Sequence, residues 1–547
     1  MEERQSNNVK HGKLDLRVLI PGVAVCFAFV AWCMATPEAA SASMDAVMNF
    51  LSEKFGWLYL IAVFAFVVFL VGIAFSRIGK IKLGHDDEKP EYKMSSWLFM
   101  MFSAGMGIGL VFWSVGEPMS LYLEPPINEG STIAAAQEAM SLTFMHWGIT
   151  PWACYGVVGL VLAYFQYRKG RSALLGSCLA FGGDRNSSRF DKLALVVDIL
   201  AVIVTIFGVS TSLGMGALQI SAGLNYAFGI PNTLVTKLIV VVIATVVFVL
   251  SGAVGIGKGM KRLSTLNIGL AGVLIAAVFF SGSAVFVLDY FSESLGAYLQ
   301  DFVKMSLWAD AFGEAPGWLG SWTVFYWAWW ISWTPFVGSF VAHISRGRTI
   351  REFIACILLA PAVISFLFIT VMGGNAIALD LGGNPAIAMA MQGDISYAPF
   401  ALYENLQVLA GTPAVQILAG ITIVLLFVFF VTSADSATLV CAQQTCNGEP
   451  NPPRKIKAVW GIVLALVSAM LLCVGGLSSL QTVSIVVAFP FIFVIGALMV
   501  SFVRVARNEV NDIDKLKSGE GSNEEPNEKP SDEPNGELTE ALSEQTP

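Results

Sequence analysis

Aromatic residues are concentrated in one stretch of the chain, GSWTVFYWAWWISWTPFVG, at residues 320–338. It holds five of the 14 tryptophans, although an indole is large and carries an N–H that needs an acceptor. On a helix, Trp329 and Trp333 share a face at i, i+4. Tyr326, Trp330 and Trp333 share another. Ring faces turned to one place can bind a cation that has no N–H to donate, at about 0.5–2 kcal/mol per ring.

A second aromatic cluster lies in HWGITPWACYG, at residues 146–156. Trp152 and Tyr155 are three residues apart and share a helical face, and Pro151 allows Trp147 to bend towards it. An interfacial aromatic belt is the alternative explanation for Trp147. The central tryptophans of the first stretch lie too deep in their segment for a belt, so we predict an aromatic pocket.

Two apolar segments carry residues that interrupt a helix. In SAGMGIGLVFWSVGEP, glycines stand at 105, 107 and 109, and each costs roughly 1 kcal/mol relative to Ala inside a helix. Pro335 removes one N–H from the tryptophan-rich segment. Close helix packing through small residues is the alternative for the glycines. The matched break at Pro335 favours a binding site between the two segments, because broken backbone at membrane depth is tolerated where it lines a cavity.

The chemistry of the predicted ligand follows from what the two segments lack. Neither the glycine break nor residues 320–338 contain Asp or Glu. A primary amine would need carboxylate or carbonyl acceptors for its N–H groups. The pattern therefore predicts a quaternary ammonium ligand.

A candidate ion site lies in FVFFVTSADSATLV, where Thr432 and Ser433 place adjacent hydroxyls deep in an apolar segment. Hydroxyls together with carbonyls freed by a broken helix suit Na⁺. The alternative is that both hydroxyls bond to their own helix at i−4. For Asp435 and Asp198 we expect capping or network roles.

These residues must be held by membrane helices. The chain of 547 residues is 55% hydrophobic and 13% charged, where a soluble protein has about 25% charged residues, and its mean hydropathy is +0.68. Twelve segments approach the roughly 20 apolar residues that span a bilayer. They are 18–35, 57–76, 96–116, 147–166, 193–222, 234–251, 265–289, 320–343, 353–373, 414–436, 458–476 and 483–503.

Loops rich in Lys and Arg alternate with loops that lack them, with Lys304 as the exception. The positive-inside rule then places both termini in the cytoplasm. We expect an amphipathic helix on the outer surface at 292–312. The eight cysteines and four histidines are scattered, so we predict no zinc site, no disulfide framework and no enzyme. No basic tract suggests binding to nucleic acid.

The Trp-rich stretch followed by ISRGRTIREF, with GMGIGLVFWSVGEP and HWGITPWACYG, resembles the betaine/carnitine/choline transporter family. The resemblance covers about residues 15–505. It implies an all-α membrane protein with twelve transmembrane helices, in which two extra helices precede a LeuT-like five-plus-five inverted repeat. The expected parts are a cytoplasmic tail (1–17), two helices (18–95), a first repeat (96–290), an outer amphipathic segment (291–319), a second repeat (320–503) and an acidic, disordered cytoplasmic tail (504–547).

The resemblance also implies roles for the matching residues. Those that bind the substrate would be Trp147, Trp152, Tyr155, Trp329, Trp330, Trp333 and Met106. Sodium would be held by Ser103, Met106, Phe429, Thr432 and Ser433. A second sodium site would include Thr205 and Phe336, although Val209 lacks the hydroxyl that betaine symporters offer one turn after Thr205.

The expected function is sodium-coupled import of glycine betaine or a related onium osmolyte by alternating access. The alternatives are a sodium-independent carnitine or choline exchanger and a solute-sensing receptor of the same fold. Expected partners are the substrate, sodium as coupling ion with no other cofactor, the lipid of a bacterial inner membrane and two further copies of the chain in a homotrimer. The acidic tail should be repelled by anionic lipid, so we expect no tail-driven osmotic activation.

Overall fold

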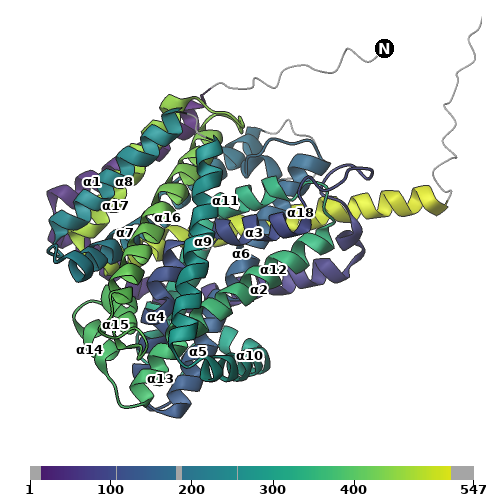
Figure 1. Ribbon diagram of the computed structural model, residues 1–547. Coiled ribbons are helices and arrows are strands. Elements are labelled where there is room, and N and C mark those ends of the chain that lie inside the picture. Colours follow the sequence, from purple (N-terminus) through teal and green to yellow (C-terminus); the bar gives the residue numbers. More distant parts are fainter. Residues whose placement is uncertain (1–13, 106, 180–187, 255–256, 519–547) are drawn as a thin grey trace, which may run out of the picture.

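The computed structural model describes residues 14–105, 107–179, 188–254 and 257–518, and within these ranges the chain is almost entirely helical (Figure 1). One isolated β-bridge pairs Lys82 with Thr349. The helices are α1 Leu16–Ala35, α2 Pro37–Phe75, α3 Met94–Gly105, α4 Ile108–Leu123, α5 Ile133–Trp147, α6 Ile149–Ala163, α7 Ser188–Phe228, α8 Leu234–Val254, α9 Gly257–Ser281, α10 Ala284–Ser306, α11 Phe325–Ile344, α12 Ile350–Ile369, α13 Asn375–Leu381, α14 Ala386–Gly393, α15 Ala398–Asn405, α16 Ala414–Thr445, α17 Arg454–Val474 and α18 Leu477–Ser518.

Among the described residues, nine helices are long and apolar enough to cross a membrane, or ten if one bent pair counts as a span. The predicted spans 96–116 and 320–343 are not among them. The first is divided between α3 and α4, and the second is a π-helical turn, Gly320–Val324, followed by α11. Tryptophan and tyrosine carry polar groups that lower the hydropathy of α11. The two segments that miss the test are those predicted to build the site.

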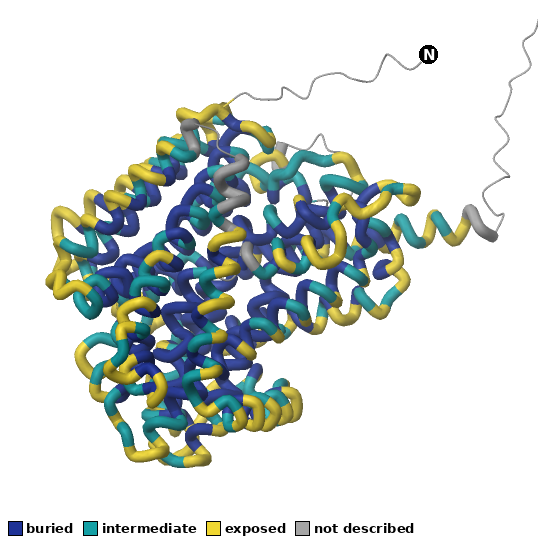
Figure 2. The backbone as a smooth tube through the Cα atoms, in the orientation of Figure 1, coloured by how far each residue is buried: buried dark blue, intermediate teal, exposed yellow. Residues whose placement is uncertain are grey.

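The outer surface of the bundle is apolar where helices face outwards. On α8, Val235, Ile239, Val242 and Val246 are all more than half exposed. Figure 2 shows exposed positions along the outer helices around a buried interior. Such a surface is stable against lipid and would aggregate in water. The architecture is that of a multi-pass membrane protein, as predicted.

The expected helix break at Pro335 is absent, which corrects the prediction of a matched pair of interrupted helices. α11 runs through Pro335 as continuous α-helix. The proline leaves the carbonyl of Ile331 without its helical N–H donor. Thr334 Oγ1 donates to that carbonyl at 2.7 Å, so the carbonyl is satisfied without opening the helix. The π-helical turn at Gly320–Val324 is the irregular part of this segment.

The predicted span 265–289 ends early. α9 stops at Ser281, and the chain turns by 108° into α10. The turn is stabilised by Asn375, whose Oδ1 accepts the backbone N–H of Ser283 at 2.9 Å. α10 is the expected amphipathic helix, shifted towards the N-terminus from 292–312. It lies at the same end of the bundle as α13–α15 (Figure 1).

The tail predicted to be disordered from residue 504 begins as helix. α18 continues to Ser518 and projects from the bundle, and residues 519–547 lie outside the described part (Figure 1). Ala506 is fully buried, so the first turns beyond the predicted span still pack on the protein.

Ion pairs hold the next turn of α18. Glu509 accepts from Tyr164 at 2.7 Å and from Arg168 at 2.7 Å, and its carboxylate pairs with Lys169 at 2.6 Å. Arg168 also pairs with Asp86 at 2.7 Å. Charge pairing therefore gives this polar stretch a fixed position that composition alone did not predict.

Candidate functional site

The glycine break separates α3 from α4 and lets predicted site residues approach the backbone. A Cβ added at Gly105 would lie 2.5 Å from the ring of Trp152, and one at Gly109 would collide with Trp329. At Gly107 it would lie 3.4 Å from the Phe429 ring. The glycines are thus close-packing positions, in agreement with the packing alternative. What they pack against is the predicted site.

The predicted aromatic residues form one connected, buried cluster. Trp329 and Trp330 are stacked with ring centroids 4.6 Å apart. Trp147 meets Trp330 edge-on at 5.0 Å and Trp329 at 6.1 Å. Tyr155 lies 6.2 Å from Trp330 and 5.5 Å from Trp152. Two segments almost two hundred positions apart in the chain therefore share one site.

Trp333 joins this cluster through a small cavity rather than through ring contact. Its ring packs against that of Phe336, with centroids 5.5 Å apart. The cavity is lined by Gly105, Gly107, Gly109, Leu110, Trp147, Ser212, Trp329, Trp330 and Trp333. Its volume of about 10 Å³ is enough for about one water molecule. A trimethylammonium group, the head of the predicted ligand, is larger than this space.

Four of these indoles are fixed by hydrogen bonds from their N–H groups. Each acceptor lies on a neighbouring helix, so the orientation of each ring depends on tertiary packing. The bonds run from Trp147 to Glu117 Oε2 (2.6 Å), from Trp329 to Ser212 Oγ (3.1 Å), from Trp330 to the His146 carbonyl (2.9 Å) and from Trp333 to the Gly208 carbonyl (2.9 Å).

Two other polar groups of the cluster lack the hydrogen-bond partner that these four indoles have. Trp152 Nε1 and the Tyr155 hydroxyl are buried and have no hydrogen-bond partner among the described residues. A buried unpaired donor is destabilising by about 1–3 kcal/mol. Both groups therefore suit a ligand or a water that brings an acceptor oxygen.

Sequence reasoning missed the polar network behind the cluster. Glu117 is fully buried, its Oε1 lies 2.6 Å from His146 Nδ1, and its Oε2 accepts hydrogen bonds from Trp147 Nε1 and the Tyr326 hydroxyl. His146 Nε2 lies 3.0 Å from Thr323 Oγ1. The signal was present, because ionisable residues inside a membrane segment mark function by default.

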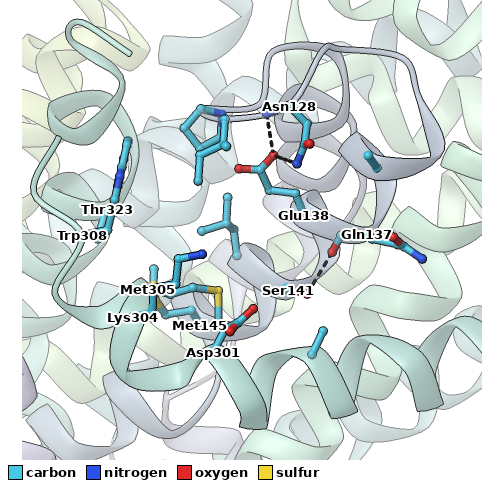
Figure 3. Close-up of a pocket in the computed structure, with 15 residues that line it drawn as sticks. Asn128, Gln137, Glu138, Ser141, Met145, Asp301, Lys304, Met305, Trp308 and Thr323 are labelled. Carbon is cyan, nitrogen blue, oxygen red and sulfur yellow. Dashed lines mark hydrogen bonds between the residues drawn. The ribbon is translucent and has the colours of Figure 1, made fainter. Parts of the chain in front are cut away.

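A larger cavity of about 420 Å³ lies beside this network, between α5 and α10 (Figure 3). Glu138 stands on one wall, where its Oε2 accepts from the backbone and side chain of Asn128 at 3.1 and 2.7 Å. Asp301 and Lys304 of α10 stand on the other. Thr323 lines the cavity too and contacts His146, so the cavity borders this network.

The predicted sodium ligands lie partly within the described residues. Phe429, Thr432 and Ser433 belong to α16, and Ser433 Oγ would be 3.8 Å from a Cβ on Gly107. Ser103 is in α3, and Met106 lies outside the described residues. The structure therefore brings α16 against the break.

The oxygen atoms present suit a hard cation. Thr432 Oγ1 donates to the Val428 carbonyl at 2.9 Å and lies 3.2 Å from the Phe429 carbonyl oxygen. The bond within its own helix is the alternative that the sequence left open. The Phe429 and Thr432 oxygens are nevertheless close enough to ligate one ion, and neutral oxygens are what Na⁺ prefers.

The second predicted sodium site offers fewer free oxygen ligands than the first. Thr205 Oγ1 donates to the Ala201 carbonyl of its own helix at 2.7 Å, and Val209 is fully buried one turn later. Phe336 packs against Trp333 on α11. Each of these contacts lies within a single helix, α7 for Thr205 and α11 for Phe336, and no described contact joins the two.

Comparisons with known proteins agree with the motifs. The model of the family described as BCCT, betaine/carnitine/choline family transporter, matches residues 17–511. A probable glycine betaine transporter of Desulfitobacterium hafniense is 42% identical over 92% of this chain and 99% of its own length. The glycine betaine transporter OpuD of Bacillus subtilis is 42% identical over 90% and 94%. An ectoine/hydroxyectoine transporter of Virgibacillus pantothenticus is 40% identical over 86% and 92%.

Proposed function

The chain belongs to the betaine/carnitine/choline transporter family, and we propose that it imports glycine betaine, or a related onium osmolyte, by sodium-coupled symport. The family and these relatives are transporters, so the chain is not an enzyme. The substrate, the coupling ion and the direction of transport are parts of the proposal.

One observation carries the choice of substrate. Four indole rings, those of Trp147, Trp329, Trp330 and Trp333, line one cavity against a glycine-broken helix. A quaternary ammonium offers no N–H, and cation–π attraction of about 0.5–2 kcal/mol per ring is the interaction that such a wall supplies. Because the cavity is small, the rings would have to move apart to admit the onium head. They would then surround it on all sides.

Sodium coupling is supported by the neutral oxygens of α16 beside the break. The Phe429 carbonyl and the Thr432 hydroxyl supply two ligands, and Ser433 faces Gly107. One sodium ion that crosses 100 mV supplies about 2.3 kcal/mol, and two supply about 4.6 kcal/mol. Two ions with a net-neutral substrate would support more than a thousandfold accumulation.

Nine apolar helices, the bent α9–α10 pair, the broken α3–α4 and the tryptophan-rich α11 together would make twelve spans. Two would precede a five-plus-five inverted repeat, with both termini in the cytoplasm of a bacterial cell and the chain assembled as a trimer in the inner membrane. Alternating access would move the site between the two faces.

Uptake of labelled glycine betaine into proteoliposomes tests the proposal. We expect uptake with an inward Na⁺ gradient and near-background uptake when K⁺ replaces Na⁺. Undiminished uptake in K⁺ would contradict symport and favour an exchanger. Binding without accumulation would favour a solute-sensing receptor.

Two variants separate the sites. We expect Trp333→Ala to raise the apparent substrate constant by about 2- to 30-fold, the loss of one cation–π partner, while sodium dependence remains. Thr432→Ala combined with Ser433→Ala should raise the sodium concentration for half-maximal uptake first. If both variants changed the same constant, the assignment of two sites would be wrong.

A further inference from the structure

Glu117 is a fully buried carboxylate in the wall behind the aromatic cluster. It lies on α4, almost three turns beyond the glycine break, and three donors converge on its two oxygens. These are His146 Nδ1, Trp147 Nε1 and the Tyr326 hydroxyl. An oxygen pair that only accepts is what an ionised carboxylate offers.

No permanent cation is among the three partners of Glu117. Two of the donors, an indole N–H and a phenol, are neutral. The third is His146, whose Nε2 lies 3.0 Å from Thr323 Oγ1. When the Thr323 hydroxyl donates to Nε2, the imidazole is neutral and still donates to Glu117 through Nδ1. Within the described part of the chain, no Lys or Arg forms an ion pair with Glu117.

One indole separates this charge from the cavity. Trp147 donates its N–H to Glu117 at 2.6 Å, while its ring lines the cavity beside Trp329 and Trp330. A charge-assisted hydrogen bond from the N–H polarises the indole and increases the negative potential of its face. In surroundings of low dielectric, the field of the carboxylate also reaches the cavity with little screening.

We propose that Glu117 is the counter-charge of the onium site, and that it acts through Trp147 without contacting the ligand. This inference rests on the proposed function and adds a residue that selects for positive charge. Direct contact would serve an ammonium that donates N–H groups. A methylated head has none, and a carboxylate in the cavity would keep water that the head must displace. Placed behind the indole, the charge keeps its three hydrogen bonds and still attracts the cation.

The test compares two solutes of the same shape. Glycine betaine and tert-butylacetate differ only in the central atom of the head, which is a positive nitrogen in one and a neutral carbon in the other. The ratio of their inhibition constants against labelled glycine betaine uptake measures selection for charge alone. We expect Glu117→Gln to lower the preference for glycine betaine by about tenfold and to change the constant for tert-butylacetate by less than about threefold.

A merely structural role for Glu117 gives a different result. Distortion of the pocket would weaken both solutes equally and leave their ratio unchanged, which would overturn the proposal. Glu138→Gln is the matched control, because it removes a carboxylate from the neighbouring cavity without touching this network. We expect its ratio to stay within about twofold of the wild type. If the preference for glycine betaine fell equally in Glu117→Gln and Glu138→Gln, the effect would come from the general electrostatic field, and the proposal would be overturned.

Glu117→Asp covers the case in which Glu117→Gln does not give a monodisperse protein. The shorter acid keeps the charge. A ratio of inhibition constants within about threefold of the wild type therefore supports the proposal, and loss of the preference for glycine betaine overturns it. Failure of the proposed function is recognised separately, because the wild type would then show no uptake of glycine betaine.

Discussion

Two carboxylates of the protein each receive three side-chain donors, and their surroundings differ in charge. Glu117 is fully buried beside the aromatic cluster, where its partners are His146, Trp147 and Tyr326. Glu509, on α18, is 10% exposed and binds Tyr164, Arg168 and Lys169. Each site includes one tyrosine hydroxyl. At Glu509 two permanent cations compensate the carboxylate, whereas at Glu117 the donors are an indole, a phenol and an imidazole.

The difference distinguishes a structural ion-pair cluster at Glu509 from a carboxylate at Glu117 that we propose attracts a bound cation. The Glu509 cluster can be satisfied entirely within the protein and fixes α18 to the turn that follows α6. At Glu117 the hydrogen bonds are satisfied, and no permanent cation takes part in them. A buried carboxylate without a permanent counter-ion is costly, and our proposal is that a bound cation completes the balance.

Removing Glu117 should impair transport far more than removing Glu509. The loss of Glu117 is the largest effect we expect. Glu117→Ala leaves three buried donors without an acceptor, at about 1–3 kcal/mol each. We expect kcat/KM for glycine betaine uptake to fall more than a hundredfold. Glu509→Ala should change it less than about threefold, because Arg168 keeps its bonds to the Gly84 carbonyl and Asp86. Equal losses of kcat/KM in well-folded samples of both variants would contradict the distinction between the two carboxylates.

Loss of a cation at the second cluster should affect stability instead. Arg168→Met removes the bonds to Glu509, Gly84 and Asp86. Because the Arg168 side chain is only 15% exposed, we expect a loss of about 1–3 kcal/mol, seen as a lower Tm in detergent. KM for glycine betaine should not change. A raised KM with an unchanged Tm would show that this cluster also serves transport.

The exposed ion pair further along α18 should matter least. Arg77 and Asp514 meet at 2.6 Å with side chains 77% and 48% exposed. Exposed pairs contribute about 0–1 kcal/mol and are screened by salt. We expect Arg77→Ala to leave both Tm and KM within measurement error. A clear change in either would mean that the end of α18 is held more firmly than the Glu509 cluster implies.

The clustering of the aromatic residues was predictable because they are unusual in type and density. Core packing alone rarely requires so many tryptophans at helical spacing next to a glycine-broken segment. The structure places Trp147, Trp329, Trp330 and Trp333 around one cavity against those glycines. Composition and local spacing carried enough information for this part of the site and for its membrane setting.

The errors came from partners distant in sequence or hidden in side-chain geometry. The helix continues through Pro335 because the Thr334 hydroxyl binds the freed carbonyl, and neighbouring polar residues do not reveal that rotamer. The 108° turn before α10 depends on Asn375, 92 residues away. Glu117 was overlooked because its role appears only when α5 and α11 supply donors. Local patterns identified the residues, while tertiary contacts decided what they do.

The smallness of the central cavity has an electrical consequence. Within the described residues, the stacked indoles leave this cavity room for about one water molecule, which is too little for a continuous file of water. If the proposed transport route passes through this cavity, the closed rings leave no file of water along which ions could cross. A cell that uses the proposed route could then keep many copies of the protein in its membrane without discharging the voltage across it.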